Sequence, residues 1–531
     1  MLVACAKSPK ADIYTTSQAG DKCAATGQVR FRQVAEPSAD ALRIYPDDER
    51  QVIDGFGGSL TESSAFVLAN LPKATKDAIL AELFSEQGAN FSLVRTQIGA
   101  SDFSVEGKYS LAEKDGDTAL ESFSLDRDKE GFPKAQYPYI QDESYDLYPL
   151  MKDVAAIKQA QRDKTYRIVA NTWTAPAWMK DNKLYYQRDA YASRGGALLP
   201  EYYSTYADYL IKYIQAYKAE GINIWAITPV NEPMGNDGGW ESMDSQPPSL
   251  PIGSLTGVIA QYLGPRLEAA SLGDVEILGF DQNTFEIGPY TAAIYGDSEA
   301  EAYTDGMALH WYGSTISCFP EVLDSIHRLY PDKKLLHTEG CVDNLGRDGW
   351  PGVSDMEGYK ESGWFNNDDF WWTPSATDWA YSTPWWPEWH PKYAATTRYA
   401  TYIIDGLNHW MTGFCDWNIV LDSIGGPTHV FNHCGAQVMI DYRNYIIYFT
   451  PYHYILRQLS RTIRPGDVVL GVTQPTCADL HVCATRRPDA TCVITMFNES
   501  AKPITVPLQV GPYVATVTTP AHALQTLVVK P

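Results

Sequence analysis

Thr228-Pro-Val-Asn231-Glu232-Pro233 closes a short apolar, β-branched run, residues 222–227, which follows a glycine. A run of this length, bounded by Gly and Pro, predicts a buried strand rather than a helix. A carboxylate at the end of a buried strand is costly unless it has a partner. In a closed barrel of strands and helices, the carboxyl ends of the strands carry the chemistry. We therefore predict that Glu232 is a catalytic carboxyl group.

Segments of strand and helix character alternate on both sides of this stretch. Strands are expected at Val52 and at 91–98, 166–171, 222–227, 275–280, 306–310, 334–339 and 412–417, and helices at 74–87, 147–163, 202–220, 254–271, 319–330 and 392–409. Eight strands that alternate with helices predict an α/β fold, a parallel (β/α)8 TIM barrel. Gly55-Phe-Gly-Gly58 is interpreted as a tight turn, because no Lys-Ser/Thr follows to make a phosphate loop.

The flanking segments predict a second domain. Residues 1–25 are expected to be a flexible leader, 26–50 to supply strands, 51–450 to form the barrel and 451–531 to form a C-terminal β-sandwich. The short strand-like runs after residue 464, with turn residues between them, are typical of a sandwich. The fold is therefore predicted to be a barrel with an appended β-sandwich formed by the N- and C-terminal segments.

Charge and composition exclude several classes of partner. The 531 residues carry a formal net charge of -23, which disfavours nucleic acid and anionic membranes as partners. No apolar run approaches the roughly 20 residues that span a bilayer. The ten histidines lack the spacing of metal ligands, so we predict neither a metal nor another cofactor. The absence of a Gly-x-Ser-x-Gly motif disfavours a serine hydrolase.

The cysteines and the N-terminus suggest export. Leu2-Val-Ala-Cys5 has the form of a bacterial lipoprotein box, although only four residues precede the cysteine, so chance remains an alternative. The other eight cysteines are an even number, and the last three, Cys477, Cys483 and Cys492, are clustered. This pattern predicts disulfides in an exported, bacterial protein, either periplasmic, cell-surface or secreted, with free buried thiols as the alternative.

A second carboxylate ends another barrel strand. Residues 334–339 end in Thr338-Glu339, and the seventh strand of a barrel lies across the mouth from the fourth. Two glutamates so placed face each other across a gap the size of a sugar. A separation of about 5 to 5.5 Å supports double displacement with retention, and about 6.5 to 9.5 Å supports inversion.

Four groups of residues resemble glycoside hydrolase family 30, the family of the lysosomal glucosylceramidase. They are the stretch from Gln51 to Glu62, Asn231-Glu-Pro, Thr338-Glu339, and Asp416-Trp-Asn-Ile-Val-Leu with Gly425-Gly-Pro. Asn-Glu-Pro occurs in a whole clan of barrel glycosidases, but the combination is more specific. The similarity runs from about residue 50 to past 460 and implies a TIM barrel, a β-sandwich and a retaining mechanism.

The resemblance also implies roles for single residues. It implies Glu232 as acid/base, Glu339 as nucleophile and Asn231 as a partner of the sugar 2-hydroxyl. The implied glucose-binding set is Asp102, Trp173 and Trp417, and further pocket positions are Trp311, Tyr312 and Asn432. For Asp102 the alternative is a helix cap, since it follows a strand. His310 is interpreted as a hydrogen-bonded support for the pocket.

The leading hypothesis is a retaining, exo-acting β-glycosidase, specifically a β-glucosidase or glucosylceramidase acting on a carbohydrate or glycolipid. A β-1,6-glucanase or β-xylosidase on the same barrel is the enzymatic alternative, and a non-catalytic carbohydrate-binding lipoprotein is the alternative of another class. Contact with a membrane is predicted only through a lipid on Cys5 or through a glycolipid substrate. Residues 364–389 hold seven of the 15 tryptophans and predict either an aromatic platform for substrate or a small core of their own.

Overall fold

Eight parallel strands close into a barrel in the computed structural model, as predicted. Their order is β10-β11-β12-β5-β6-β7-β8-β9. Their bounds are β5 (Gly55–Leu60), β6 (Leu93–Gln97), β7 (Arg167–Asn171), β8 (Ala226–Thr228), β9 (Glu276–Asn283), β10 (Gly306–His310), β11 (Lys334–Glu339) and β12 (Met411–Asp416). The structure describes residues 8–34, 40–186, 196–233, 239–243, 253–342, 364–372, 395–430, 432–473 and 476–530.

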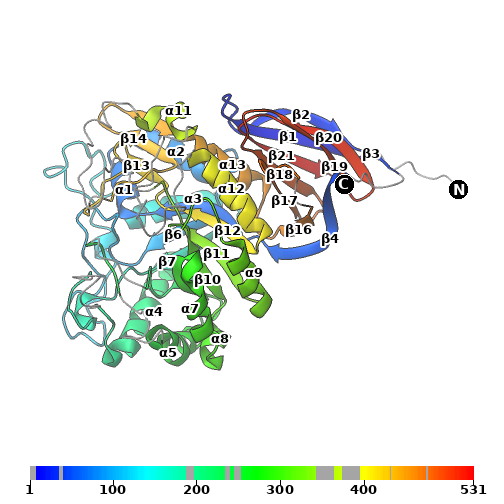
Figure 1. Ribbon diagram of the computed structural model, residues 1–531. Coiled ribbons are helices and arrows are strands. Elements are labelled where there is room, and N and C mark those ends of the chain that lie inside the picture. Colours follow the sequence, from blue (N-terminus) through cyan, green and yellow to red (C-terminus); the bar gives the residue numbers. More distant parts are fainter. Residues whose placement is uncertain are drawn as a thin grey trace, which may run out of the picture.

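Helices lie between the barrel strands and cover the barrel (Figure 1). Those described are α1 (Glu62–Ala69), α2 (Lys73–Phe84), α3 (Leu147–Ala160), α4 (Tyr203–Ala219), α5 (Gly253–Val258), α6 (Gly264–Ala269), α7 (Ile287–Ile294), α8 (Ser298–Tyr303), α9 (Pro320–Leu329), α11 (Asp368–Trp372), α12 (Ala395–Asn408) and α13 (Pro451–Thr462). In α3 the Asp146 carboxylate accepts a hydrogen bond from the first helical N–H, while Leu147, Leu150, Met151 and Val154 form the buried face. This is the spacing of an amphipathic helix.

The glycine-rich segment is a barrel strand and not the turn that we predicted. Gly55–Leu60 is buried throughout and pairs in parallel with β6 and β12. Val52, which we assigned to the barrel, instead ends β4 (Leu42–Val52) of the second domain. A side chain at Gly57 would lie 1.7 Å from the carbonyl oxygen of Leu93, so glycine is needed for close strand approach rather than for a turn.

The second domain is built from strands at both ends of the chain, as predicted, and lies beside the barrel in Figure 1. The strand order is β2-β1-β21-β18-β17-β16-β4-β19-β20-β3. Its remaining strands are β1 (Lys10–Ser17), β2 (Ala24–Arg30), β3 (Arg32–Gln33), β16 (Val468–Val472), β17 (Leu480–Arg486), β18 (Cys492–Asn498), β19 (Ile504–Val510), β20 (Tyr513–Thr519) and β21 (Ala523–Lys530). The sheet folds over on itself, so that β20 contacts β18, β21 and β2, and one apolar core lies between the facing strands.

Two predicted boundaries differ from the structure. Residues 10–17, inside the predicted flexible leader 1–25, form β1 between β2 and β21, and Ala11 and Ile13 of this strand pack on the apolar core. Residues 451–462, which we placed in the sandwich, form α13, which packs against α12 and β5 of the barrel. The C-terminal sandwich strands begin at Val468. The possible lipid site at Cys5 lies outside the described residues.

The predicted disulfides are absent among the eight cysteines that the structure describes, since no disulfide joins any two of them. The register explains this for the C-terminal cluster. In the β17–β18 pair, Cys483 lies opposite Thr495 and Cys492 lies opposite Arg486, so the two thiols do not face each other. Burial raises the pKa of both thiols to about 12, which disfavours the thiolate.

The tryptophan-rich loop is only partly described. Trp371 and Trp372 lie in α11 and are buried, so this pair belongs to a core. Trp379, Trp385, Trp386 and Trp389 lie outside the described residues, and so does the side chain of Trp364. A further small sheet, β13 (Val420–Asp422), β14 (Val438–Asp441) and β15 (Ile446–Phe449), follows the barrel. None of the described helices has the length and hydropathy needed to span a bilayer.

Candidate active site

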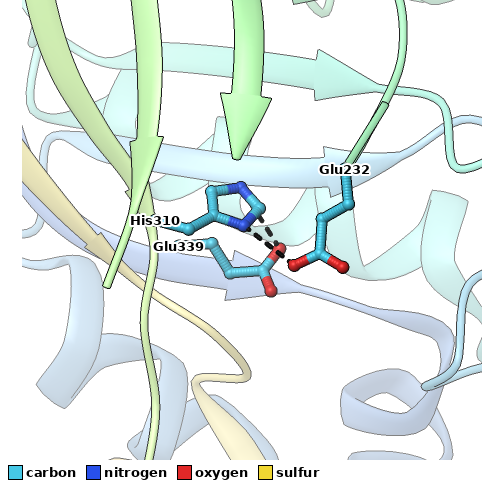
Figure 2. A group of neighbouring side chains, drawn as sticks. All are labelled: Glu232, His310 and Glu339. Carbon is cyan, nitrogen blue, oxygen red and sulfur yellow. Dashed lines mark hydrogen bonds and ion pairs between the residues drawn. The ribbon is translucent and has the colours of Figure 1, made fainter. Parts of the chain in front are cut away.

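The two predicted glutamates lie together at the carboxyl ends of their strands. Glu339 is the last residue of β11, and Glu232 follows β8 with a left-handed backbone, φ +46°. A carboxylate oxygen of Glu232 lies within 4.8 Å of one of Glu339, and in Figure 2 the two groups point toward each other beside His310. This separation belongs to the shorter class of carboxylate pairs, which supports retention.

The Glu339 carboxylate is held by two hydrogen-bond donors. Its Oε2 accepts from the Arg95 guanidinium, which projects from β6, and its Oε1 accepts from the Tyr312 hydroxyl at 2.9 Å. Burial raises the pKa of the Glu339 carboxyl group, while the charges of His310 and Arg95 partly oppose this effect. The two donors fix the orientation of the carboxylate, as an attacking group requires.

Asp281 is the buried centre of the hydrogen-bond network beneath the two glutamates. It lies in β9 with φ +57°, next to Phe280 at +73°, where the register of the β9–β10 pair shifts. Its carboxylate accepts from four side chains, Arg95 at 2.9 Å, Thr228 at 2.7 Å, Thr338 at 2.7 Å and His310 at 3.0 Å. Burial alone would raise the pKa of Asp281, but Arg95 and His310 hold it below its ordinary value. Asp281 is therefore an anion that orients cationic neighbours.

His310 bridges the network to Glu232. Its Nδ1 lies 3.2 Å from Glu232 Oε1 and its Nε2 lies 3.0 Å from Asp281 Oδ1. Burial lowers the pKa of His310, but Glu339, Asp281 and Glu232 raise it to about 9. At neutral pH both ring nitrogens therefore carry protons and donate. Glu232, His310 and Glu339 are close enough to hold a metal ion, but the ion would have to displace these protons and the Arg95 contact.

Most of the predicted sugar-binding side chains lie around this network. Trp173 and Trp417 stack with ring centroids 5.0 Å apart, and Arg95 lies 4.8 Å from the Trp173 ring. Asn231 Oδ1 accepts from Arg95 at 2.6 Å. Asp102 Oδ2 accepts from Asn432 at 2.9 Å, whereas the buried Oδ1 has no hydrogen-bond partner in the described protein. An unsatisfied buried oxygen of this kind suits a sugar hydroxyl.

Trp311 does not lie with this group, although we predicted it as a pocket residue. Its ring packs edge to face on Tyr399 and Tyr402 of α12, and its indole N–H donates to the Cys341 carbonyl at 3.2 Å. The reason is strand alternation: His310 and Tyr312 point into the barrel mouth, so the residue between them points outward. Trp311 is therefore a core residue.

Arg95 and Asp281 are the functional residues that the sequence interpretation missed. Arg95 lies inside the apolar run 91–98 and resembled a tolerated strand residue. Asp281 directly follows the predicted strand 275–280, which extends three residues further in the structure. A charged residue on the inward-facing side of a barrel strand is the signal that would have identified both, because only a charge partner makes such burial acceptable.

Comparisons with known proteins agree with this fold. The model of the glycosyl hydrolase family 30 TIM-barrel domain matches residues 53–351 and 389–463, and that of the family 30 beta sandwich domain matches residues 468–527.

Relatives divide between two activities. The chain is 26% identical to the lysosomal acid glucosylceramidase of Mus musculus, over 88% of this chain and 79% of the relative. It is also 26% identical to an endo-1,6-beta-D-glucanase of Neurospora crassa, over 96% of this chain and 92% of the relative.

Solved structures share the whole architecture. SrfJ from Salmonella typhimurium superposes with a TM-score of 0.78 at 24% identity, over 98% of this chain and 100% of the other, which is a likeness of fold. The endo-beta1,6-glucanase BT3312 superposes with a TM-score of 0.73 at 27% identity and the same coverage.

Proposed function

The chain belongs to glycosyl hydrolase family 30 and is a retaining glycosidase, and we propose that it is an exo-acting β-glucosidase with Glu339 as nucleophile and Glu232 as acid/base. The observation that carries the assignment of the two residues is the separation of their carboxylates, within 4.8 Å. A water molecule and a sugar do not both fit between groups this close, so inversion is disfavoured.

The reaction proceeds in two displacements. Glu339 attacks the anomeric carbon while the bond to the leaving oxygen breaks, and Glu232 transfers its proton to that oxygen. Water then attacks the same carbon, Glu232 takes the proton from this water, and the bond to Glu339 breaks to release the sugar. Arg95 and Tyr312 support the proposal, because their hydrogen bonds hold Glu339 toward the reacting carbon in both steps.

The two roles are tested with substrates that differ in the leaving group. Glu339→Ala removes the nucleophile and is expected to reduce kcat at least ~10⁴-fold on every β-glucoside. Glu232→Ala removes the acid/base but leaves the nucleophile, so it is expected to slow an alkyl β-glucoside ~10² to 10⁴-fold while sparing glycosylation by a dinitrophenyl β-glucoside, whose leaving group needs no proton. Equal losses on both substrates in both variants would contradict the assignment.

External azide separates the roles further. A small anion replaces the missing base in the second displacement, so Glu232→Ala is expected to form a β-glucosyl azide. Glu339→Ala is expected to form the α-anomer, because azide then attacks the face that the nucleophile has left open. The anomeric configuration of each product is read by proton NMR, and reversed configurations would exchange the two roles.

For the substrate we propose a glucosylceramide or a similar β-glucoside, which the glucosylceramidase relative supports. β-1,6-Glucan is the second candidate, since the Neurospora crassa glucanase matches over 92% of its own length. A hydrolysis panel of aryl β-glucoside, aryl β-xyloside, glucosylceramide and β-1,6-glucan distinguishes them. Glucose released from chain ends supports exo action, mixed oligomers support endo action, and binding without hydrolysis would support a non-catalytic carbohydrate-binding protein.

A further inference from the structure

A fully buried acid lies in the loop that follows Glu232. Glu241 is 0% exposed, and its Oε1 accepts a hydrogen bond from the backbone N–H of Lys108. Its Oε2 lies 3.3 Å from His429 Nε2. His429 in turn donates from Nδ1 to the Ser104 carbonyl at 3.0 Å. Both ring nitrogens of His429 therefore face oxygen atoms, the Glu241 carboxylate on one side and the Ser104 carbonyl on the other.

These contacts join three loops at the carboxyl end of the barrel. Ser104 and Lys108 belong to the loop after β6, Glu241 to the loop after β8, and His429 to the segment after β13. Each loop also contains a residue of the proposed site, since Asp102, Glu232 and Asn432 are within ten residues of these contacts along the chain. The Glu241–His429 pair therefore links the acid/base loop to the loops around Asp102.

The segment that carries His429 holds Asp102 directly. Thr428 Oγ1 donates to the Asp102 carbonyl at 2.8 Å, and Asn432 Nδ2 donates to Asp102 Oδ2 at 2.9 Å. Both the backbone and one carboxylate oxygen of Asp102 are thus fixed, and the buried Oδ1 remains for a ligand. The position of Oδ1 depends on this segment, which Glu241 holds from the other side.

The residue after Glu241 is tied to the loop of Trp173. Lys180 Nζ, which is buried, donates to the Ser242 carbonyl at 2.6 Å and to Thr174 Oγ1 at 2.7 Å. Thr174 directly follows Trp173, so Glu241 and Ser242 together contact the loops that carry two predicted sugar-binding residues. Ordinary loop folding does not require a buried carboxylate and imidazole at this point, and their burial is costly without a function or a partner.

We propose that Glu241 and His429 are positioning residues for substrate binding, which hold Asp102 Oδ1 in place to accept a sugar hydroxyl. The inference rests on the proposed function, because it takes the pocket to bind a glucoside. Burial, and then the charges of Glu339 and Glu241, raise the pKa of Asp102. A displacement of Asp102 Oδ1 weakens binding of the sugar in the ground state and in the transition state by the same amount. KM is therefore expected to rise while kcat stays nearly unchanged.

The test uses single variants of the full chain and an aryl β-glucoside. Glu241→Ala is expected to raise KM about tenfold with kcat within about threefold of the wild type. Glu241→Gln is expected to recover most of this loss, because its amide oxygen still accepts from Lys108 and its NH2 group still faces His429 Nε2. His429→Ala is expected to match Glu241→Ala and serves as the second variant if one of them fails to fold. Glu113→Ala is the matched control. It breaks a carboxylate contact to the Ser110 N–H in the loop after β6, which also carries Lys108, and its KM is expected to stay within twofold of the wild type.

A double-mutant cycle asks whether Glu241 acts through Asp102. If it does, Asp102→Ala/Glu241→Ala loses no more than about twofold beyond Asp102→Ala alone. Additive losses, or a lower kcat at unchanged KM, would overturn the inference and leave Glu241 a structural residue. Glucose binding, followed by tryptophan fluorescence, gives a readout without turnover and is expected to weaken about tenfold in Glu241→Ala. If the wild type hydrolyses glucosides and the Glu241 and His429 variants have an unchanged KM, only this inference is contradicted. If the wild type neither binds nor hydrolyses glucosides, the proposed function and the inference are contradicted together.

Discussion

At the scale of single residues, Asp281 determines the orientation of the two glutamates, Glu232 and Glu339, through the residues that contact them. A buried carboxylate with four donors has no lone pair left to compete for substrate, so its role is to orient Arg95 and His310. Arg95 then meets Glu339, and His310 meets Glu232. One anion thereby fixes a cation beside each of the two groups that are proposed to react, and this preorganisation precedes substrate binding.

The pH dependence of activity follows from the raised pKa of Glu339. The nucleophile must be ionised, so kcat/KM falls as the pH falls through this pKa. Burial raises the pKa of Glu339, so the fall of kcat/KM at low pH, the acid limb of the profile, is expected at a pH above the ordinary glutamate pKa of about 4.3. The profile of kcat/KM between pH 3 and pH 8 measures this limb.

His310→Gln provides the matched comparison for that limb. His310, with a pKa of about 9, is a cation throughout the acid range and favours the Glu339 carboxylate. Its removal is therefore expected to move the acid limb to higher pH. A limb that stays in place or moves to lower pH would show that His310 does not stabilise the ionised nucleophile.

Strand-end reasoning predicted that Glu232 and Glu339 lie together, because the carboxyl ends of all barrel strands meet at one mouth. The family resemblance predicted Trp311 as a pocket residue and was wrong there, since motif similarity does not specify which face of the strand a side chain occupies. Strand-end reasoning also missed Arg95, because a charge inside an apolar run has meaning only once its partner on another strand is known. Long-range partners of this kind cannot be derived from one sequence.

At the scale of elements, the barrel depends on a strand that consists largely of glycine. Strand β5 pairs with β6 and β12 and closes the barrel between the first and last βα units. Gly57 leaves no space for a side chain against the Leu93 carbonyl. The turn that we expected from glycine composition was wrong because glycine permits close backbone approach as well as left-handed conformations.

Gly57→Ala is expected to separate β5 from β6 and to destabilise the barrel severely, by roughly 3 kcal/mol or more, as overpacking of a rigid contact does. Gly257→Ala, in helix α5 with open space around the glycine, is the control and is expected to be neutral or to stabilise by up to ~1 kcal/mol. Thermal unfolding followed by circular dichroism measures both. A melting temperature for Gly57→Ala equal to that of the wild type would contradict the close-approach argument.

The alternation of strands and helices was sufficient to predict the barrel, because each element carries its own periodicity. The position of β1 was not predictable in the same way. Its pairing with β21 joins residues more than 500 positions apart, and residues 1–25 contain no turn signal that reveals such a contact. The free thiols in β17 and β18 were missed for a related reason, since register decides which side chains meet.

At the scale of the whole molecule, the buried amide of Gln458 is one of the links between the barrel and the sandwich. Gln458 of α13 accepts from Thr16 of β1 at 2.8 Å and donates to the Tyr14 carbonyl, the Leu524 carbonyl and Thr526. These partners lie on β1 and β21, the strands formed by the two ends of the chain. The fully buried Gln458 side chain thus helps to fasten both ends of the chain to the barrel.

Gln458→Leu is expected to lower the free energy of unfolding by about 2 kcal/mol, because it leaves buried polar partners unsatisfied. The hydrogen-bond partners of Gln458 are Thr16, Tyr14, Leu524 and Thr526, none of them a residue of the proposed site, so kcat and KM at 25 °C are expected to stay unchanged. Gln159→Leu, on the exposed side of α3, is the control and is expected to change stability by less than ~0.5 kcal/mol. Equal melting temperatures for the two variants would show that the amide does not couple the domains.

The central claim is that Glu339 forms a covalent bond to the sugar while Glu232 donates a proton to the leaving oxygen. Incubation with an activated 2-deoxy-2-fluoro-β-glucoside slows the second displacement and allows the intermediate to accumulate. We predict that mass spectrometry of the digested protein finds one fluoroglucosyl group, attached to the peptide that contains Glu339. A label on Glu232 or on another carboxylate, or inactivation without any label, would contradict the account.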